Sequence, residues 1–252
     1  IYDLLPLQFP HFWETQHSVH RIVEEWMRVI ASLDGVFCIS ESVAHDFRKW
    51  FDEAKVSRSR AFQIKWFHLG ADMTEHIAAS GSLSADAQCA IDCIQSKPSF
   101  LIVGTLEPRK GHAQVLDAFE HLWCEGLSVN LVIVGKQGWL VDDLVGRLRT
   151  HSELNHRLFW LEAISDEYLE AVYAASTCLI AASYGEGFGL PLIEAAQHKL
   201  PIIARDIPVF REVAGEHAHY FSAETPNDLA NAIRDWLSLF EKQQHAASAD
   251  IP

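Results

Sequence analysis

The chain has 252 residues, 49% of them hydrophobic, and a formal net charge of −14 at pH 7. This length suits one large domain or two modest ones with a substantial buried core. The acidic balance argues against nucleic acid as a main partner, because phosphate backbones are bound by basic surfaces.

The first residues of the chain, IYDLLPL at 1–7, are typical of the end of a buried strand. Because the sequence opens on Ile1 and not on a methionine, we expect the natural N-terminus to lie upstream. The same feature predicts that only the last part of a first domain is present.

Short apolar runs alternate with amphipathic stretches of helical period along the rest of the chain. The apolar runs predict strands at residues 35–40, 62–70, 99–105, 129–135, 157–161, 177–183 and 200–204. The amphipathic stretches predict helices at residues 17–33, 41–51, 112–125, 165–175, 191–198 and 226–244. Most strand candidates lack polar alternation, so both of their faces should be buried. The alternation therefore predicts a doubly wound α/β fold, with a parallel sheet covered by helices on both faces.

A polar stretch rich in small residues interrupts this alternation at residues 73–98. Such a composition is typical of a connection between domains. The sequence therefore predicts a partial α/β unit at residues 1–72, a linker at 73–98 and a complete α/β unit at 99–252.

The cysteines and the hydropathy bear on the compartment. The 5 cysteines are odd in number and scattered, which predicts reduced thiols and a cytoplasmic protein. Cys89 and Cys93 have helical spacing, but no histidine pair accompanies them, so no metal site is predicted. No apolar run approaches the roughly 20 residues that cross a bilayer.

The stretch VGTLEPRKGH, residues 103–112, follows a predicted strand and precedes a predicted helix. Arg109 and Lys110 fall in the turn between them, beside a helix N-terminus and free backbone N–H groups. Such an arrangement favours a bound polyanion. A solvated turn with surface cations is the alternative interpretation. The stretch is not a Walker A loop, because the G-x-x-x-x-G-K-[ST] order is absent.

The stretch YGEGFGLPLIEA, residues 184–195, follows another predicted strand. Gly187 and Gly189 would let backbone amides approach a ligand without interference from a Cβ atom. The helix predicted from Pro191 points its positive end at the same place. Glu194 would lie in the first turn of that helix, where a glutamate is favoured without any ligand. That explanation does not cover Glu186 and its flanking glycines, so the pattern indicates a binding loop.

A third strand end meets a helix start in FWLEAISDEY, residues 159–168. A flat ring could lie against residues 161–164 there and bond to the backbone, although an ordinary strand-to-helix connection explains the pattern as well. Together the three stretches supply an anion-binding turn, two carboxylates that could bind hydroxyl groups, and a segment that could bind a base. A nucleoside diphosphate that carries a sugar has these three parts.

At this point the residues resemble a known family. GEGFGLPLIEA matches the signature of two glutamates with seven residues between them in retaining glycosyltransferases of family 4, which have the GT-B fold of two facing Rossmann-like domains. VGTLEPRKG resembles the phosphate loop of that family. FHLGAD, residues 67–72, resembles its turn between domains, and CISESVAHDF, residues 38–47, is similar to the start of the last helix of its N-terminal domain.

The resemblance implies roles for the residues that match. Arg109 and Lys110 would neutralise the diphosphate leaving group, and Glu186 would contact the hydroxyls of the donor sugar. Glu194 would accept hydrogen bonds from the ribose, and Ile164 would border the base. The residues implied in donor binding are Gly104, Thr105, Ile164, Gly187, Phe188, Gly189, Leu190 and Glu194. No metal and no separate cofactor are implied, because the nucleotide sugar is itself the substrate.

The family retains the anomeric configuration, and the favoured account is attack from the face that the leaving group departs from. Catalysis then consists of stabilising the leaving diphosphate and an oxocarbenium-like sugar. This sequence departs from the pattern where many members have an arginine, since Thr105 follows Gly104, and Arg109 is expected to supply that charge. It also has Tyr2 and Asp3 near the position where a histidine often stands, and it lacks a glycine-rich loop near its start.

GTLEPRKG, VIVGKQGW at 132–139 and YGEGFGLP together resemble bacterial mannosyltransferases that build surface polysaccharides such as O-antigen. The resemblance implies a hexosyltransferase with GDP-mannose as donor and a growing glycan or lipid-linked acceptor, at the inner face of the membrane. The alternatives are a UDP-sugar-dependent transferase, an epimerase or phosphorylase of the same fold, and a non-catalytic nucleotide-binding module. A phosphorylase would need a lysine for pyridoxal phosphate, and none stands out.

Residues 45–60 are locally basic and carry Trp50 and Phe51. The stretch could contact an anionic membrane, where a lipid-linked acceptor would lie. The alternative is an amphipathic helix with a solvated face, and the sequence leaves both open.

Overall fold

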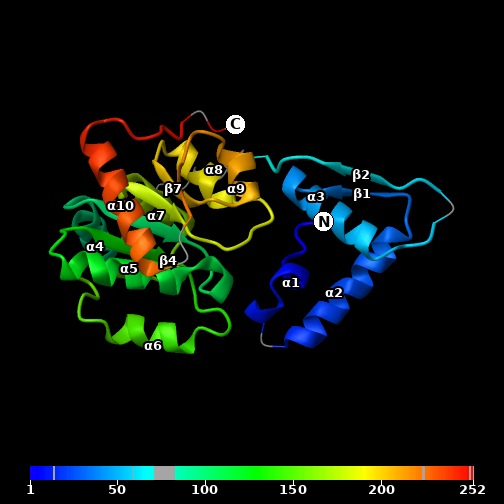
Figure 1. The fold of residues 1–252 in the computed structure, drawn as a ribbon. Helices are drawn as coiled ribbons and strands as arrows, with labels where there is room; N and C mark the ends of the chain where they lie inside the picture. The colour runs from blue at the N-terminus through cyan, green and yellow to red at the C-terminus, as the bar shows by residue number, and fades with distance from the viewer. Residues whose placement is uncertain (14, 59, 71–82, 223–224, 250, 252) are drawn as a thin grey trace.

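The computed structural model describes all residues except 14, 59, 71–82, 223–224, 250 and 252. Figure 1 shows two bodies side by side, a smaller one in blue and cyan and a larger one in green to red. We call residues 1–70 the N-terminal unit and residues 83–251 the C-terminal unit.

The N-terminal unit consists of helices around a two-stranded parallel sheet. Its elements are α1 Leu5–Gln8, the 3-10 turn η1 Pro10–Phe12, α2 Gln16–Ala31, β1 Gly35–Cys38, α3 Glu41–Glu53 and β2 Gln63–Trp66. Helix α3 begins where the sequence predicts, because the Ser40 hydroxyl accepts the N–H of Val43 and caps the helix. The apolar side of α3, with Phe47 fully buried, faces the core of this unit, while Arg48 and Lys49 are exposed. Residues 45–53 of the basic stretch thus belong to an amphipathic helix with a solvated face, and contact with a membrane stays a prediction.

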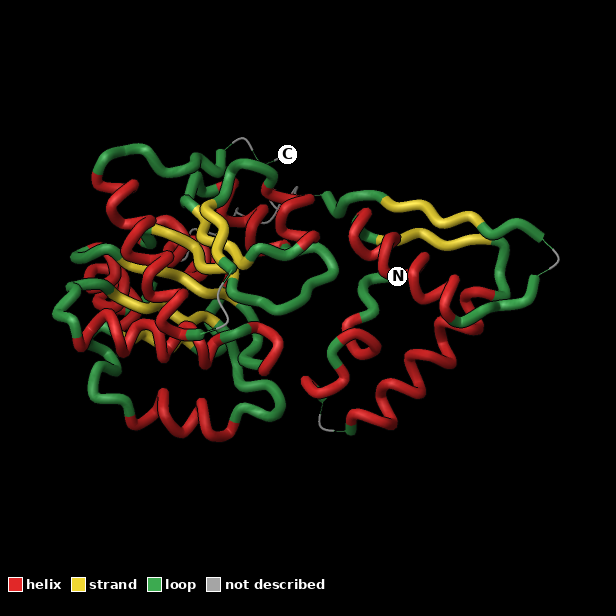
Figure 2. Tube along the Cα trace, in the orientation of Figure 1, coloured by secondary structure: helices red, strands yellow, loops and turns green. Residues whose placement is uncertain are grey.

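The C-terminal unit holds a six-stranded parallel sheet with helices on both faces (Figure 2). Its strands are β3 Ser99–Val103, β4 Asn130–Val134, β5 Leu158–Leu161, β6 Cys178–Ala181, β7 Ile202–Arg205 and β8 His219–Phe221. Its helical elements are α4 Ala85–Gln95, η3 Pro108–Lys110, α5 His112–Cys124, α6 Asp142–Thr150, α7 Asp166–Ala175, α8 Leu190–Gln197, α9 Pro208–Ala214 and α10 Pro226–Glu241.

The strand order is β5-β4-β3-β6-β7-β8, which is the order of a dinucleotide-binding sheet. After β3, strands β4 and β5 are added toward one edge of the sheet. The chain then crosses back to β6, and strands β7 and β8 are added toward the other edge. The direction of winding therefore reverses between β3 and β6. Ligands of such sheets bind beyond the carboxyl ends of the strands at this switch point. A ligand is therefore expected at the loops that follow β3 and β6.

Two buried cores confirm the doubly wound prediction. Helices α5, α6 and α10 pack on one face of the sheet, around Phe119, Leu148 and Trp236. Helices α4, α7, α8 and α9 pack on the other face, which we call the second core, around Val172 and Phe210. Strand β4 is buried at every position, which explains why its sequence shows no polar alternation.

Several predictions of local structure were wrong. Residues 1–7 contain no strand, and helix α1 begins at Leu5. The amino group of Ile1 nevertheless donates to Phe37 O of β1 at 2.6 Å, and the carbonyl of Ile1 accepts the N–H of Ile39 at 3.1 Å. Helix α4 lies inside the predicted linker, and its Ile94 is fully buried in the second core. Residues 71–82 of that linker lie outside the described residues, so the proposed domain boundaries stay a prediction. No helix was predicted for α6 and no strand for β8.

The two units are joined at the N-terminus of α3. The carboxylate of Glu212, on α9, accepts the backbone N–H of Glu41 at 2.6 Å and that of Ser42 at 2.7 Å. It also accepts the Ser42 hydroxyl at 2.6 Å, and its other oxygen lies 2.8 Å from Nε2 of His68. A carboxylate is favoured there because the first turn of a helix leaves its N–H groups unpaired and carries a positive partial charge.

Glu212→Gln is expected to lower the free energy of unfolding at neutral pH by about 1–3 kcal/mol, because hydrogen bonds to a charged acceptor are lost. Burial raises the pKa of Glu212, but hydrogen bonds from Ser42, Glu41 and His68 outweigh burial and hold the pKa below its usual value of 4.5. The stabilisation is therefore complete above the unfolded pKa and is lost as the pH falls through the lower folded pKa.

Urea titrations at neutral pH and at an acid pH below the folded pKa measure this effect. Wild type and Glu212→Gln should differ at the higher pH and converge at the lower one. The exposed Glu216, for which no hydrogen bond is observed in the described structure, provides the matched control as Glu216→Gln. A difference that stays constant with pH would contradict a role for the charge.

Candidate functional site

The loops after β3 and β6, residues 104–111 and 182–189, lie against each other at the switch point. The backbone N–H of Tyr184 donates to Arg109 O at 2.9 Å. One guanidinium nitrogen of Arg109 donates to Gly185 O, also at 2.9 Å. The cationic turn and the glycine-rich loop, predicted separately from the sequence, therefore form one site.

Glu186 is at the centre of this site. Its carboxylate forms ion pairs with Lys110 at 2.6 Å and with Arg109 at 2.9 Å, and it accepts the hydroxyl of Ser183 at 2.7 Å. Burial raises the pKa of Glu186, but Lys110 and Arg109 outweigh burial and hold the pKa below its usual range. The group is thus a buried, ionised carboxylate with two cations on it. Ser183 was missed because a serine before a glycine loop has no distinctive pattern.

Arg109 is bound more extensively than the sequence predicts. Besides Glu186 and Gly185 O, its guanidinium donates to Glu107 at 2.8 Å. Glu107 is only 5% exposed, and burial raises the pKa of its carboxyl even though Arg109 and Lys110 act in the other direction. Arg109 therefore bridges two buried carboxylates. Its contact with a diphosphate stays a prediction. The ammonium of Lys110 bonds only to Glu186 among the described residues.

The glycines of the β6 loop are required mainly by the protein itself. Gly189 has φ of 99° and directly precedes α8, in a region that other residues adopt at a cost. At Gly187, a Cβ atom would lie 2.1 Å from the carbonyl oxygen of Tyr2. At Gly185, a Cβ atom would lie 2.6 Å from the side chain of Leu5. The sequence interpretation that Gly187 makes room for a ligand was incomplete, because the N-terminal unit fills the space of its missing side chain.

The backbone amides of residues 187–190 are the second predicted element of the site. In the part of the chain that the structure describes, none of these N–H groups donates to a protein acceptor. Helix α8 starts at Leu190, so the groups lie at its positive end. Phe188 can contribute only through its backbone, because its ring is 4% exposed in the second core. The side chain of Leu190 is half-exposed.

Glu194 is placed differently from the prediction. Because α8 starts at Leu190 and not at Pro191, Glu194 falls beyond the first turn, so the helix dipole is a weaker reason for its presence. Its Oε2 accepts the hydroxyl of Tyr173, on α7, at 2.5 Å. Burial and the charge of Glu194 both raise the pKa of Tyr173, so the phenol stays a donor. Tyr173 stacks on the ring of His198 with centroids 5.1 Å apart. The contacts of Tyr173 with Glu194 and His198 were not predicted from the sequence.

The remaining predicted residues surround these groups. The side chain of Lys110 lies over Gly104, where a Cβ atom would be 3.6 Å from Nζ. Thr105 follows Gly104 in the same loop. Ile164 is partly buried against the second core, directly before Ser165, the N-cap of α7. The structure therefore brings Gly104, Lys110 and Glu186 into contact, whereas Ile164 and Glu194 are each associated with α7.

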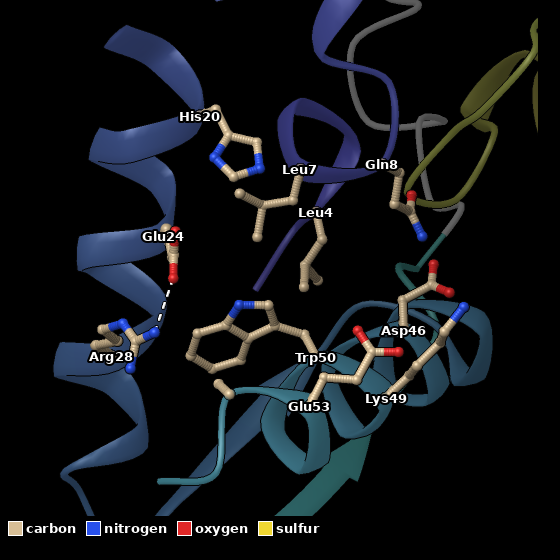
Figure 3. Close-up of a pocket in the computed structure, with 11 residues that line it drawn as sticks. Leu4, Leu7, Gln8, His20, Glu24, Arg28, Asp46, Lys49, Trp50 and Glu53 are labelled. Carbon is tan, nitrogen blue, oxygen red and sulfur yellow. Dashed lines mark hydrogen bonds and ion pairs between the residues drawn. The ribbon is translucent and has the colours of Figure 1, made fainter. Parts of the chain in front are cut away.

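The described structure has several cavities at the site and others within the N-terminal unit. One of about 840 Å³ opens between the two units, and its lining includes Tyr184, Glu186, Trp66 and His68. Another of about 450 Å³ lies within the N-terminal unit, between α1, α2 and α3. Figure 3 shows the second cavity, with Trp50 facing Leu4 and Leu7 and with the Glu24–Arg28 ion pair at its side. None of the predicted site residues lines the second cavity.

His112, the first residue of α5, is 1% exposed, and burial lowers its pKa to about 3. It is therefore neutral and contributes no charge to the site. In the described ranges, no cluster of three or more histidine, cysteine, aspartate or glutamate side chains could hold a metal ion. No helix in those ranges is long and apolar enough to span a membrane.

Comparison with known proteins decides the family. Residues 92–250 match the family described as glycosyl transferases group 1. The chain belongs to the group 1 glycosyltransferases. Prediction of the family and of its GT-B fold is thereby confirmed.

Curated relatives of this group 1 glycosyltransferase include the serotype-specific mannosyltransferase WbdA of Escherichia coli. The identity is 50% over 254 aligned residues, which cover all of this chain and 31% of WbdA. The chain thus spans about a third of the length of that relative. The O-antigen chain mannosyltransferase RfbU of Salmonella typhimurium is 32% identical over 57% of this chain and 40% of its own.

Solved structures share the fold at low identity. Anabaena HepE, solved in complex with UDP and glucose, superposes with a TM-score of 0.68 at 18% identity, covering all of this group 1 glycosyltransferase and 64% of HepE. Trehalose-6-phosphate synthase of E. coli, bound with UDP-2-fluoro glucose, superposes with a TM-score of 0.70 at 13% identity, over 94% of this chain and 59% of its own.

Proposed function

We propose that this chain binds a nucleoside-diphosphate sugar at the loops after β3 and β6 and transfers its hexose, with retention, to a glycan acceptor. The proposal is carried by one observation. A cation, an ionised carboxylate and backbone N–H groups that have no protein acceptor in the described structure lie together at the switch point of the sheet. Lys110 and Glu186 supply the first two, 2.6 Å apart. Residues 187–190 supply the third.

The diphosphate and Glu186 would compete for Lys110. When the diphosphate arrives, its oxygens accept from the Lys110 ammonium and from the amides of residues 187–190, where an anion is favoured by the end of α8. Glu186, relieved of one cation, then accepts hydrogen bonds from hydroxyls of the donor sugar. Arg109 keeps the loop in place through Gly185 O. Each group thus has a role that follows from its contacts in the free protein.

Transfer proceeds by breaking the bond between the anomeric carbon and the phosphate oxygen, whose electron pair stays on the diphosphate. The acceptor hydroxyl forms the new bond on the same face, and its proton passes to the departing phosphate oxygen. Lys110 and the amides stabilise the charge that develops on the diphosphate. No protein nucleophile and no metal ion are required in this proposal.

GDP-mannose is the proposed donor, and a growing surface glycan or its lipid-linked form is the proposed acceptor. The relatives WbdA and RfbU are both named mannosyltransferases, and RfbU is named for the O-antigen chain. The cysteines of the described structure are unpaired, which suits a reducing cytoplasm. Work at the inner face of the membrane is part of the proposal.

Calorimetric titration with GDP, UDP and ADP tests the donor. GDP should bind most tightly, since guanine is the base of the proposed donor. Tightest binding of UDP would favour the UDP-sugar-dependent alternative, and absence of binding by all three would overturn the proposal. Binding of GDP without transfer from GDP-mannose to a mannose-containing glycan would favour a non-catalytic nucleotide-binding module.

Glu194→Ala is expected to weaken GDP binding by about 1–3 kcal/mol, because an acceptor for the ribose hydroxyls is removed. The variant also leaves the Tyr173 hydroxyl without its acceptor, so Tyr173→Phe is the matched control. Calorimetry on both variants separates the two effects. If Tyr173→Phe loses as much affinity as Glu194→Ala, the carboxylate acts by supporting the tyrosine and not by binding ribose.

A further inference from the structure

Ser40 lies between the two units and bonds to both. Its side chain is fully buried. The hydroxyl accepts the N–H of Val43 at 3.1 Å, as the cap of α3, and donates to the carbonyl of Gly187 at 2.8 Å. A serine hydroxyl has one proton to donate, so that proton is committed to the β6 loop.

This hydrogen bond fixes the orientation of one peptide group. In a planar trans peptide the carbonyl and the following N–H point in opposite directions. With Gly187 O directed at Ser40, the N–H of Phe188 is directed away from the N-terminal unit. That N–H is one of the site's backbone N–H groups that have no protein acceptor in the described structure.

The loop is held at a second carbonyl from the other side. Arg109 donates to Gly185 O at 2.9 Å. Glu186 therefore lies between two anchored carbonyls, one bonded to the C-terminal unit and one to the N-terminal unit. At Gly187 itself the backbone lies against Tyr2 O of the N-terminal unit, so close that a Cβ atom would be 2.1 Å from this oxygen.

We propose that Ser40 is a positioning residue for the donor, acting through the Gly187–Phe188 peptide. The inference rests on the proposed function, since it assigns Ser40 to the diphosphate subsite of that site. Loss of the hydroxyl would allow the peptide to rotate, so that the Phe188 N–H no longer points at the diphosphate. Recognition of the phosphates should suffer, and recognition of the nucleoside should not.

Four proteins test the proposal: wild type, Ser40→Ala, Ser40→Thr and Ser84→Ala. Ser84 is the N-cap of α4, where its hydroxyl accepts the N–H of Ala87, and it has no contact with the β6 loop in the described structure. Ser84→Ala therefore removes a helix cap of the same kind without touching the site. Threonine keeps the hydroxyl at position 40 and should restore the wild-type behaviour.

Calorimetry with GDP and with guanosine gives the first measurement. Ser40→Ala should bind GDP about tenfold more weakly, as expected from the loss of one buried hydrogen bond, with unchanged affinity for guanosine. Ser40→Thr and Ser84→Ala should match wild type. Unchanged GDP affinity in Ser40→Ala, or an equal loss for guanosine, would overturn the positioning role.

Hydrogen–deuterium exchange without any nucleotide gives the second measurement. The amide of Tyr184, which donates to Arg109 O within this loop, should exchange faster in Ser40→Ala than in wild type or Ser84→Ala. If wild type itself binds no nucleotide, the proposed function fails, and a faster exchange would still establish that Ser40 holds the loop. Equal exchange in all four proteins would overturn the inference alone. Ser40→Cys, which keeps the volume but donates weakly, replaces Ser40→Ala if the alanine variant does not fold.

Discussion

Arg109→Met is expected to lower the free energy of unfolding by about 3–5 kcal/mol, which is the usual consequence of removing one partner from buried ion pairs. The guanidinium bonds to Glu107, Gly185 O and Glu186, and its side chain is 14% exposed. Without it, the buried carboxylate of Glu107 loses the one side-chain hydrogen bond that it has in the described structure. Equilibrium unfolding in urea at neutral pH measures the loss.

Lys110→Met is the matched control for Arg109. Its side chain is 16% exposed and bonds to Glu186, which would still be paired with Arg109. Lys110→Met should therefore cost less stability than Arg109→Met but more affinity for GDP. Equal losses of stability in the two variants would contradict the assignment of Arg109 as the structural cation and Lys110 as the phosphate-binding one.

Glu186→Gln is expected to change transfer and product binding in opposite directions. Transfer from GDP-mannose should fall by about 10- to 100-fold, because a charged acceptor for the sugar hydroxyls is replaced by a neutral one. Binding of GDP alone should become tighter, because GDP lacks the mannose that Glu186 would contact and because the neutral glutamine side chain competes less than a carboxylate with the diphosphate for Lys110. The Lys110–Glu186 ion pair of the free protein is the basis of this second expectation.

Transfer assays with a mannose-containing acceptor and calorimetry with GDP check the two effects. Glu216→Gln, an alteration of an exposed glutamate for which no hydrogen bond is observed in the described structure, is the control for a change of net charge. Weaker binding of GDP by Glu186→Gln would show that the carboxylate supports the diphosphate and does not compete with it. Unchanged transfer would remove Glu186 from the reaction.

Local signals in the sequence predicted most of the fold. Helices α3 and α7 begin where a serine caps the first turn, at Ser40 and Ser165, because capping involves residues three apart. The apolar strand runs were identifiable because a parallel strand is buried on both faces. Strand β8 was missed because its local signal is weak: it has three residues and lies at the edge of the sheet.

The candidate site, too, was predicted only in part from the sequence. The spacing of Glu186 and Glu194 and the adjacent cations Arg109 and Lys110 are visible in the sequence, and they lead to a nucleoside-diphosphate sugar. The sequence did not reveal that Lys110 and Glu186 neutralise each other in the free protein, because the two residues are 76 positions apart. It did not reveal the bond of Glu194 to Tyr173 for the same reason.

By itself, then, the sequence determined the class of fold, the family and the residue types of the site. Caps, periodicity and short motifs depend on neighbours within a few positions, which a sequence displays directly. Only the tertiary structure decided why Gly187 is a glycine and what Ser40 does besides capping α3. Both answers depend on Tyr2 O and Gly187 O, atoms of distant segments that come within contact distance only when the two units pack together.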